Sequence, residues 1–219
     1  IFPMIIGSLY VTAGAIAMGV PVGVMCAVFM ARYCPARLYK VLRPAVDLLA
    51  GIPSVVYGFF GLVVIVPAVR QLFGGGKSVF TAALLLAIMI LPTIISISEA
   101  ALRSVPQSYY EGALALGATK ERAIFGVSLP AARSGVSAGI ILGIGRAIGE
   151  TTAIVMIAGN QPIIPNSIFS GVRTLTTNII LEMGYAQDLH REALIATAAV
   201  LFIFVLLINL LFSALKKTS

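Results

Sequence analysis

Four long stretches of this sequence contain no charged residue, and they limit the possible folds more than any other feature. The stretches are Ile1–Ala31, Leu48–Val69, Ser78–Ser98 and Ala193–Leu215. Each is at least as long as the roughly 20 residues that a helix needs to cross a bilayer. Within hydrocarbon, only helices and closed barrels satisfy every backbone N–H and C=O group. A barrel would show alternating strands of about ten residues, which these stretches lack, so we expect transmembrane helices.

A fifth apolar stretch, Ser134–Val172, is interrupted only by Arg146 and Glu150. The chain is 59% hydrophobic and 11% charged, whereas soluble domains contain about a quarter charged residues. These features predict an all-α, polytopic membrane protein in which residues 1–219 form a single transmembrane domain with five spans. Because the sequence starts within an apolar stretch at Ile1, we expect one further span before it, which would make six in the native protein.

The basic residues predict the orientation of the spans. Those after the first, third and fifth spans are Arg32, Arg37, Lys40, Arg43, Arg103, Lys120, Arg122, Arg133, Lys216 and Lys217. Those on the other side are fewer, namely Arg70, Lys77, Arg173 and Arg191. Basic residues accumulate in cytoplasmic loops, so we expect the first loop, the third loop and the C-terminus in the cytoplasm. The net charge of +7 therefore reflects membrane topology, and we predict no nucleic-acid partner.

The sequence has no pattern typical of an enzyme. Cys26 and Cys34 indicate neither a disulfide framework nor a metal site, and His190 has no cluster of ligands around it. We find no nucleophile with a neighbouring base and no glycine-rich phosphate loop, so ATP hydrolysis is not expected on this chain. We predict no cofactor.

Residues 104–132, in the third loop, have the signals of a short helical hairpin. Ser104 and Gln107 have the spacing of a capping box, and Pro106 suits the first turn of a helix. Gly117 is a natural left-handed helix terminator. Thr119 can cap a second short helix, and Pro130 is expected to end it.

The first helix of this hairpin has an apolar face formed by Tyr110, Ala113 and Leu114, which share one side at helical spacing. An apolar face on a cytoplasmic segment needs a partner. The residues alone do not decide between two partners for this face. The face packs against the membrane helices of its own chain, or it docks on another protein.

The hairpin resembles the EAA loop of ABC importer permeases. The resemblance lies in Glu111-Gly112-Ala113, then Gly117 after three residues, and Val127-Ser128-Leu129-Pro130 after nine more. Gly112 replaces the second residue of the family motif, an alanine, and Val127 replaces an isoleucine. The resemblance implies the type I, MetI-like permease fold and a coupling helix that docks on a separate ATPase. The implied coupling residues are Tyr110, Glu111, Gly112, Ala113, Leu114, Gly117, Leu129 and Pro130.

Three further segments, Leu48–Gly61, Gly143–Asn160 and Val172–Leu194, are similar to the permeases of phosphate importers, and the last favours the PstC-type subunit. This resemblance implies phosphate as substrate and a prokaryotic inner or plasma membrane as location. It also implies a PstA-like second permease subunit (or a homodimer), two cytoplasmic ATPase subunits and an extracytoplasmic phosphate-binding protein. The alternatives are a permease for sulfate, molybdate or tungstate, and a secondary transporter driven by an ion gradient.

Arg146 and Glu150 are the charges expected within the membrane, where each costs about 2.5–3.5 kcal/mol to insert. Their spacing of four places them on one helix face, where they can pair. Gly135, Gly139 and Gly143 lie along the same face and predict close helix packing. Two roles remain open for the pair. Either Arg146 meets the substrate anion while Glu150 orients it or exchanges partners, or the two form a permanent ion pair that locks the bundle.

Three other residues complete the predicted substrate path. Pro53 disrupts the preceding turn, and a half-helix that starts near Ser54 would direct free N–H groups at an anion. The alternative is an ordinary proline kink.

Thr151 lies next to Glu150, and Asn160 lies on the outer side. Further polar residues on that side are candidates for contact with substrate or a delivery protein, namely Arg173, Thr176, Thr177 and Asn178.

Overall fold

The computed structural model describes residues 1–218, and it describes side chains through residue 210. In this part of the chain the regular structure is helical, with one isolated bridge between Gly159 and Val172. The first half contains α1 (Phe2–Val28), η1 (Phe29–Tyr33), α2 (Ala36–Gly51), α3 (Ser54–Phe60), η2 (Gly61–Ile65), α4 (Val66–Phe73) and α5 (Val79–Ser104). The second half contains α6 (Gln107–Ala115), α7 (Lys120–Ala123), η3 (Ile124–Ser128), α8 (Leu129–Ala131), α9 (Arg133–Gly149), α10 (Thr152–Ile157), α11 (Leu175–Met183) and α12 (Asp188–Thr218). The η elements are π-helical turns.

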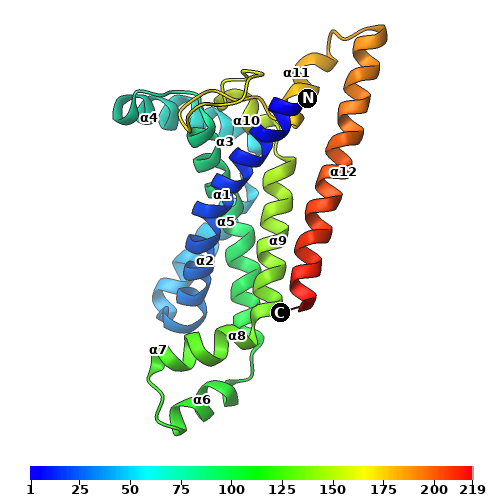
Figure 1. The fold of residues 1–219 in the computed structure, drawn as a ribbon. Coiled ribbons are helices and arrows are strands. Elements are labelled where there is room, and N and C mark those ends of the chain that lie inside the picture. Colours follow the sequence, from blue (N-terminus) through cyan, green and yellow to red (C-terminus); the bar gives the residue numbers. More distant parts are fainter. Residues whose placement is uncertain (219) are drawn as a thin grey trace.

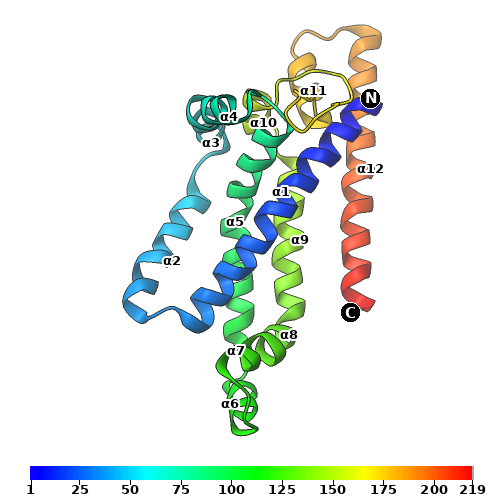
Figure 2. The ribbon, with the colours of Figure 1, turned by 60° about the vertical axis from the view of Figure 1, so that its left-hand side comes forward.

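The long helices run roughly parallel to one another, and short helices cover both ends of the bundle (Figures 1 and 2). The chain descends in α1, returns in α2, descends in α5, rises in α9 and descends again in α12. The hairpin of α6 and α7 projects from the lower end. The N-terminus, α10 and α11 lie at the upper end, and the last turns of α12 lie toward the hairpin end.

Four helical segments have the length and hydropathy of a membrane span, namely Phe2–Tyr33, Ser54–Phe73, Val79–Ser104 and Asp188–Leu210. A fifth span is possible if Lys120–Ala131 and Arg133–Gly149 count as one segment bent by 70°. These segments overlap all five predicted stretches, but residues 48–53 of the second stretch and 150–172 of the fifth lie outside them.

The second predicted span, Leu48–Val69, is not one continuous helix. Backbone at Ile52 and Pro53 is extended, and it separates α2 from α3. The rising pass is made by α2, while α3, η2 and α4 lie across the upper end of the bundle (Figures 1 and 2). The reason is that Pro53 lacks an N–H group for α2 and restricts the residue before it to extended backbone. The alternative of an ordinary proline kink is therefore wrong.

Glycines allow α5 to pack closely against the helices on either side of it. A Cβ atom on Gly135 would lie 2.4 Å from the Ala101 Cβ, and one on Gly143 would lie 2.9 Å from the Ile94 side chain. On the α1 side, a Cβ atom on Gly19 would lie 2.9 Å from Ile90. The predicted close-packing face of α9 is confirmed, and it places α9 directly against α5.

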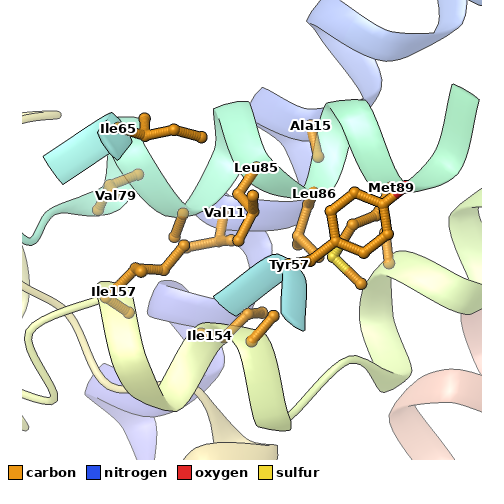
Figure 3. Packing of buried hydrophobic residues seen from close by; sticks show 14 of the residues in the cluster. Val11, Ala15, Tyr57, Ile65, Val79, Leu85, Leu86, Met89, Ile154 and Ile157 are labelled. Carbon is orange, nitrogen blue, oxygen red and sulfur yellow. The ribbon is translucent and has the colours of Figure 1, made fainter. Parts of the chain in front are cut away.

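The main core lies where α3 and α10 meet the upper halves of α1 and α5. Figure 3 shows Tyr57 of α3 beside Leu86 and Met89 of α5, which belong to the same buried cluster. Ile154 and Ile157 bring α10 into this cluster. A Cβ atom on Gly58 would lie 2.9 Å from the Ala153 Cα, so the two short helices are in backbone contact. The chain therefore anchors both half-helices to α5.

Candidate coupling and translocation sites

The hairpin turn has the geometry that its sequence predicts. Gly117 has a φ of +86°, the left-handed conformation that glycine adopts without strain. The Gly117 N–H donates to the Leu114 carbonyl at 2.9 Å, and the Ala118 N–H donates to the Ala113 carbonyl at 3.1 Å. These two bonds are those of a Schellman motif. Thr119 Oγ1 accepts from the Arg122 N–H at 3.3 Å and caps α7, as predicted.

The predicted start of the hairpin is wrong. Ser104 is the last residue of α5, and its hydroxyl donates to the Ala101 carbonyl at 2.8 Å instead of capping α6. Pro106 is the residue before α6, which has no side-chain cap. The capping box does not form because α5 continues through Ser104, where a serine hydroxyl readily bonds a carbonyl of the preceding turn.

Pro130 does not end the second helix of the hairpin, contrary to prediction. It lies in the first turn of α8, which follows η3 without a break. In the π-helical turn η3, the Leu129 N–H donates to the Ile124 carbonyl five residues before it. This wider turn accommodates a proline that has no N–H to offer. The chain bends only after α8, at Ala132.

The face of α6 is divided between the chain's own core and solvent. Tyr110 is half-buried and packs, with Leu129, against a cluster that includes Leu102, Val105 and Ile124. Leu114 is 38% exposed and Leu116 is 91% exposed. Glu111 and Gly112 are also exposed. Packing on the chain's own helices therefore accounts for Tyr110 and leaves an exposed apolar and acidic surface on α6.

Arg146 and Glu150 do not form the ion pair that their spacing allows, so the alternative of a permanent ion pair that locks the bundle is wrong. Helix α9 ends at Gly149, and Glu150 has extended backbone with a ψ of 130°. The Glu150 side chain therefore leaves the helix face on which Arg146 lies. Its Oε1 atom accepts from the N–H groups of Thr151 and Ala153, each at 3.1 Å. Glu150 thus caps α10, where a negative charge is favourable.

Arg146 is half-buried, near the end of α9. No hydrogen bond or ion pair to its side chain is found among residues 1–210, although basic residues elsewhere in the bundle have acidic partners. A buried or half-buried charge within a membrane bundle usually faces a partner or a water-filled path. Arg146 is therefore a half-buried cation whose charge is not neutralised by any side chain in the described part of the chain.

Thr151 and Thr176 line one end of a groove beside the break that follows α9. The Thr151 hydroxyl donates to the Gly149 carbonyl at 3.2 Å, and the Thr176 hydroxyl donates to the Glu150 carbonyl at 3.2 Å. The groove has a volume of about 440 Å³ and is bounded on its other side by Leu201 and Val205 of α12. The walls of the groove are mostly apolar. At its polar end, the Thr151 and Thr176 hydroxyls are already bonded to the carbonyls of the break after α9. A larger groove of about 690 Å³ between α1 and α5 contains none of the predicted site residues.

Ser54 begins α3, as the half-helix interpretation predicts. Its side chain is half-buried. The preceding break is held by the Tyr57 hydroxyl, which donates to the Leu49 carbonyl at 2.8 Å. Because α3 contacts α10 at Gly58 and Ala153, the structure brings the first half-helix next to the second.

Asn160 lies in a hydrogen-bonded network of the segment between α10 and α11. It adopts a left-handed φ of 54°, its Nδ2 donates to the Val155 carbonyl at 2.7 Å, and its own carbonyl accepts from Arg173 Nε at 3.0 Å. Arg173 also donates to Asn178 at 3.2 Å and to Glu182 at 2.7 Å. Hydrogen bonds from Tyr185 and Arg173 lower the pKa of the Glu182 carboxyl below its usual value of 4.5. Asn160 thus belongs to a network that secures the outer loop.

Sequence reasoning missed a second charged cluster, centred on Glu99 of α5. Glu99 is 1% exposed. It accepts from Arg103 at 2.7 Å and from Arg43 of α2 at 3.1 Å. The Arg103 guanidinium lies 4.6 Å from the centre of the Tyr39 ring. The i,i+4 spacing of Glu99 and Arg103 was the available signal, but the contact with α2 depends on tertiary packing.

Comparison with known families decides the class of this protein. The model of the binding-protein-dependent transport system inner membrane component matches residues 19–218. The chain belongs to this family. It is therefore a multi-pass inner-membrane permease component, and its fold class is the one predicted.

Relatives and solved structures agree with this assignment. YqgH of Bacillus subtilis, a probable ABC transporter permease protein, is 42% identical over 99% of this chain and 72% of its own length. The phosphate transport system permease protein PstC of Mesorhizobium japonicum is 35% identical over 93% of this chain and 69% of its own length. An inward-facing structure of the MetNI methionine ABC transporter matches with a TM-score of 0.76 at 20% identity, over 97% of this chain and 92% of that one. The structural match confirms the fold of ABC importer permeases.

Proposed function

We propose that this protein is the PstC-type permease subunit of an ATP-driven importer of inorganic phosphate. The observation that carries the proposal is its similarity to permeases named for phosphate transport, at 34–35% identity over most of the chain. The three segments similar to phosphate permeases support the same substrate. They contain the two half-helix starts, at Ser54 and at Thr152, and the outer network around Arg173.

In this proposal Arg146 is the contact for the phosphate anion. It is half-buried, it lies one turn before the break at Glu150, and no acidic partner neutralises it within residues 1–210. Glu150 holds α10 in place through its two backbone hydrogen bonds. Thr151 and Ser54 line the approach at the starts of the two half-helices, and Asn160 keeps the outer loop in position.

The remaining subunits follow from the proposed class. The complex contains two cytoplasmic ATPase subunits, on which ATP hydrolysis takes place, and one of them binds the exposed surface of α6, which includes Glu111, Gly112 and Leu114. Ala113, Gly117, Leu129 and Pro130 set the shape of the hairpin, while Tyr110 holds it to the bundle. A PstA-like subunit completes the pore, and an extracytoplasmic binding protein delivers phosphate. A permease for sulfate, molybdate or tungstate and an ion-driven secondary transporter are the less favoured functions.

A test of this proposal uses the complex co-purified with its native partners and reconstituted in vesicles. We expect phosphate, together with its binding protein, to stimulate ATP hydrolysis, and sulfate or molybdate to have little effect. Stimulation by another oxyanion and not by phosphate would change the proposed substrate, but it would leave the proposed class, an ATP-driven importer, unchanged. Uptake that follows an ion gradient and needs no ATP would overturn the class.

The proposed orientation has its own test. A cysteine at Lys77 should react with an impermeant maleimide from outside the cell. A cysteine at Lys120 should react only after the cytoplasmic side is opened. Labelling at the opposite sides would reverse the assignment of the hairpin and of the C-terminus to the cytoplasm.

A further inference from the structure

The cytoplasmic end of α1 contacts both limbs of the coupling hairpin. Helix α1 finishes in the π-helical turn η1, which is closed by a 2.8 Å bond from the Cys34 N–H to the Phe29 carbonyl. Two side chains of this turn, Arg32 and Tyr33, reach residues at the start of α6 and at the start of α7. Both side chains are half-buried.

Arg32 joins α1 to the point where the chain leaves α5 and enters α6. Its Nη2 atom donates to the Leu102 carbonyl at 2.7 Å, and its Nη1 atom donates to Gln107 Oε1 at 3.4 Å. The last carbonyls of α5 have no partner within the helix, and a cation is favourable at that end. Only the planar guanidinium presents two parallel donors that can serve both acceptors at once.

Tyr33 holds the other limb. The Lys120 ammonium, at the first residue of α7, lies 4.7 Å from the centre of the Tyr33 ring. A cation over an aromatic face is attracted by the negative potential of the ring. Tyr33 also packs against the buried cluster that includes Leu102 and Ile124, and Tyr110 and Leu129 of the hairpin pack against the same cluster.

The turn η1 is itself fixed to α5. Arg103 donates to the Met30 carbonyl at 2.9 Å, while its Nε atom is bound to the buried Glu99. Arg32 and Tyr33 therefore extend from a segment that moves with both α1 and α5. Among the described residues, Gln107 supplies the one side-chain hydrogen bond from α6 to the rest of the bundle.

We propose that Arg32 and Tyr33 are positioning residues that hold the two limbs of the coupling hairpin and transmit its movement to α1 and α5. This proposal rests on the proposed function, in which α6 receives the movement of an ATPase. Neither residue touches the ATPase or the substrate in this account. They act through Gln107 and Lys120.

The experiment compares Arg32→Gln with Arg37→Gln in the complete complex in vesicles. Arg37 is an exposed basic residue in the first turn of α2, and no hydrogen bond or ion pair of its side chain is found in the described part of the chain, so its replacement removes a positive charge from the same end of the bundle. Arg32→Gln should lower the number of substrate molecules transported per ATP about ten-fold. This is the change that loss of one charge-assisted hydrogen bond causes in an equilibrium. Arg37→Gln should leave this ratio unchanged.

Hydrogen exchange of the amides of residues 107–120 provides a readout that needs no substrate. Arg32→Gln should reduce their protection about ten-fold, with no loss of protection in α5. Tyr33→Leu should reduce it about three-fold, whereas Tyr33→Phe keeps the aromatic face and should restore it. The Tyr33 variants keep the proposal testable if Arg32→Gln fails to assemble.

Wild-type protection and an unchanged transport ratio in both Arg32→Gln and Tyr33→Leu would overturn the positioning role. A loss of ATPase activity and transport in equal proportion, with normal hairpin protection, would also overturn it. Failure of phosphate to stimulate the wild-type complex would instead reject the proposed function. The exchange comparison would then still decide the positioning role.

Discussion

Charged residues within the helix bundle of this protein occupy two regions with opposite arrangements. Near the hairpin end of α5, the buried Glu99 is bound by Arg43 and Arg103, and Asp47 is a second acidic partner of Arg43, so the two cations face two carboxylates of the chain. Near the break after α9, Arg146 has no acidic partner among residues 1–210, and Glu150 is bound to backbone N–H groups. The first cluster links α2 to α5 through ion pairs, whereas Arg146 is the cation that we propose as the contact for the substrate anion.

The largest expected loss of stability follows from removing both cations of the first region. Arg43→Gln combined with Arg103→Gln leaves Glu99 buried without an ionic partner. This should lower the free energy of unfolding by about 3–5 kcal/mol. Glu99→Gln should cost less, about 1–2 kcal/mol, because Arg43 and Arg103 are partly exposed and regain water. Unfolding of the purified protein in detergent measures both variants, and equal costs would contradict a compensated cluster.

The hairpin turn should respond to the shape of one residue. Gly117→Val forces a β-branched residue into the left-handed region and should destabilise the turn by about 1–2 kcal/mol. We expect the complex to assemble but to hydrolyse ATP with little transport. Gly184→Ala is the control, because Gly184 lies outside the hairpin, has a right-handed φ of −66°, and a Cβ atom there meets no neighbour within 4 Å. Normal transport by Gly117→Val, measured per ATP, would reject the coupling role of this turn.

Glu150 variants test the second charged region, because the Glu150 carboxylate caps α10. Glu150→Ala should lower the free energy of unfolding by about 1 kcal/mol. Glu150→Gln keeps an oxygen that can accept from the Thr151 and Ala153 N–H groups, so its cost should be smaller. If instead Glu150→Gln were the more damaging variant, the charge itself would be the important feature. Such a result would favour an ion pair between Glu150 and Arg146 in another conformation of the protein.

The smallest effect is expected in the outer network, and it depends on pH. The pKa of Glu182 is lowered by its hydrogen bonds with Tyr185 and Arg173. The stability that this carboxylate contributes is therefore fully present above about pH 4.5, and it is lost as the pH falls through the lower pKa of the folded state. Wild type and Glu182→Gln should differ in melting temperature at pH 7, and the difference should shrink below pH 4.5. A constant difference down to pH 3 would show that Glu182 acts by packing and not by charge.

Local sequence signals predicted the parts of the molecule that depend on local backbone chemistry. Gly117 and Thr119 terminate and cap helices by themselves, and both predictions are confirmed. The glycines of α9 predicted a packing face, because a helix face without side chains allows any neighbouring helix to approach closely. The apolar stretches predicted a helical membrane bundle, since no other continuous structure suits their length and composition.

The incorrect predictions concern places where tertiary contacts decide between two local options. Glu150 continues the apolar helical pattern in the sequence, but its extended backbone is stabilised by Thr176 and by its own bonds to α10. Ser104 suits a helix cap equally well, yet α5 continues through it. The Glu99 cluster unites residues 56 positions apart. Spacing along one helix cannot reveal such a contact.

The most direct test of the central claim is phosphate uptake by vesicles that contain the Arg146→Gln complex, measured together with the yield of assembled complex. Our account predicts normal assembly, because no partner in the described chain loses an ion pair, and uptake reduced at least about ten-fold by loss of the anion's charged contact. Arg37→Gln serves as the control for loss of one positive charge. Normal phosphate uptake by Arg146→Gln would contradict the account, as would a failure of this variant to assemble.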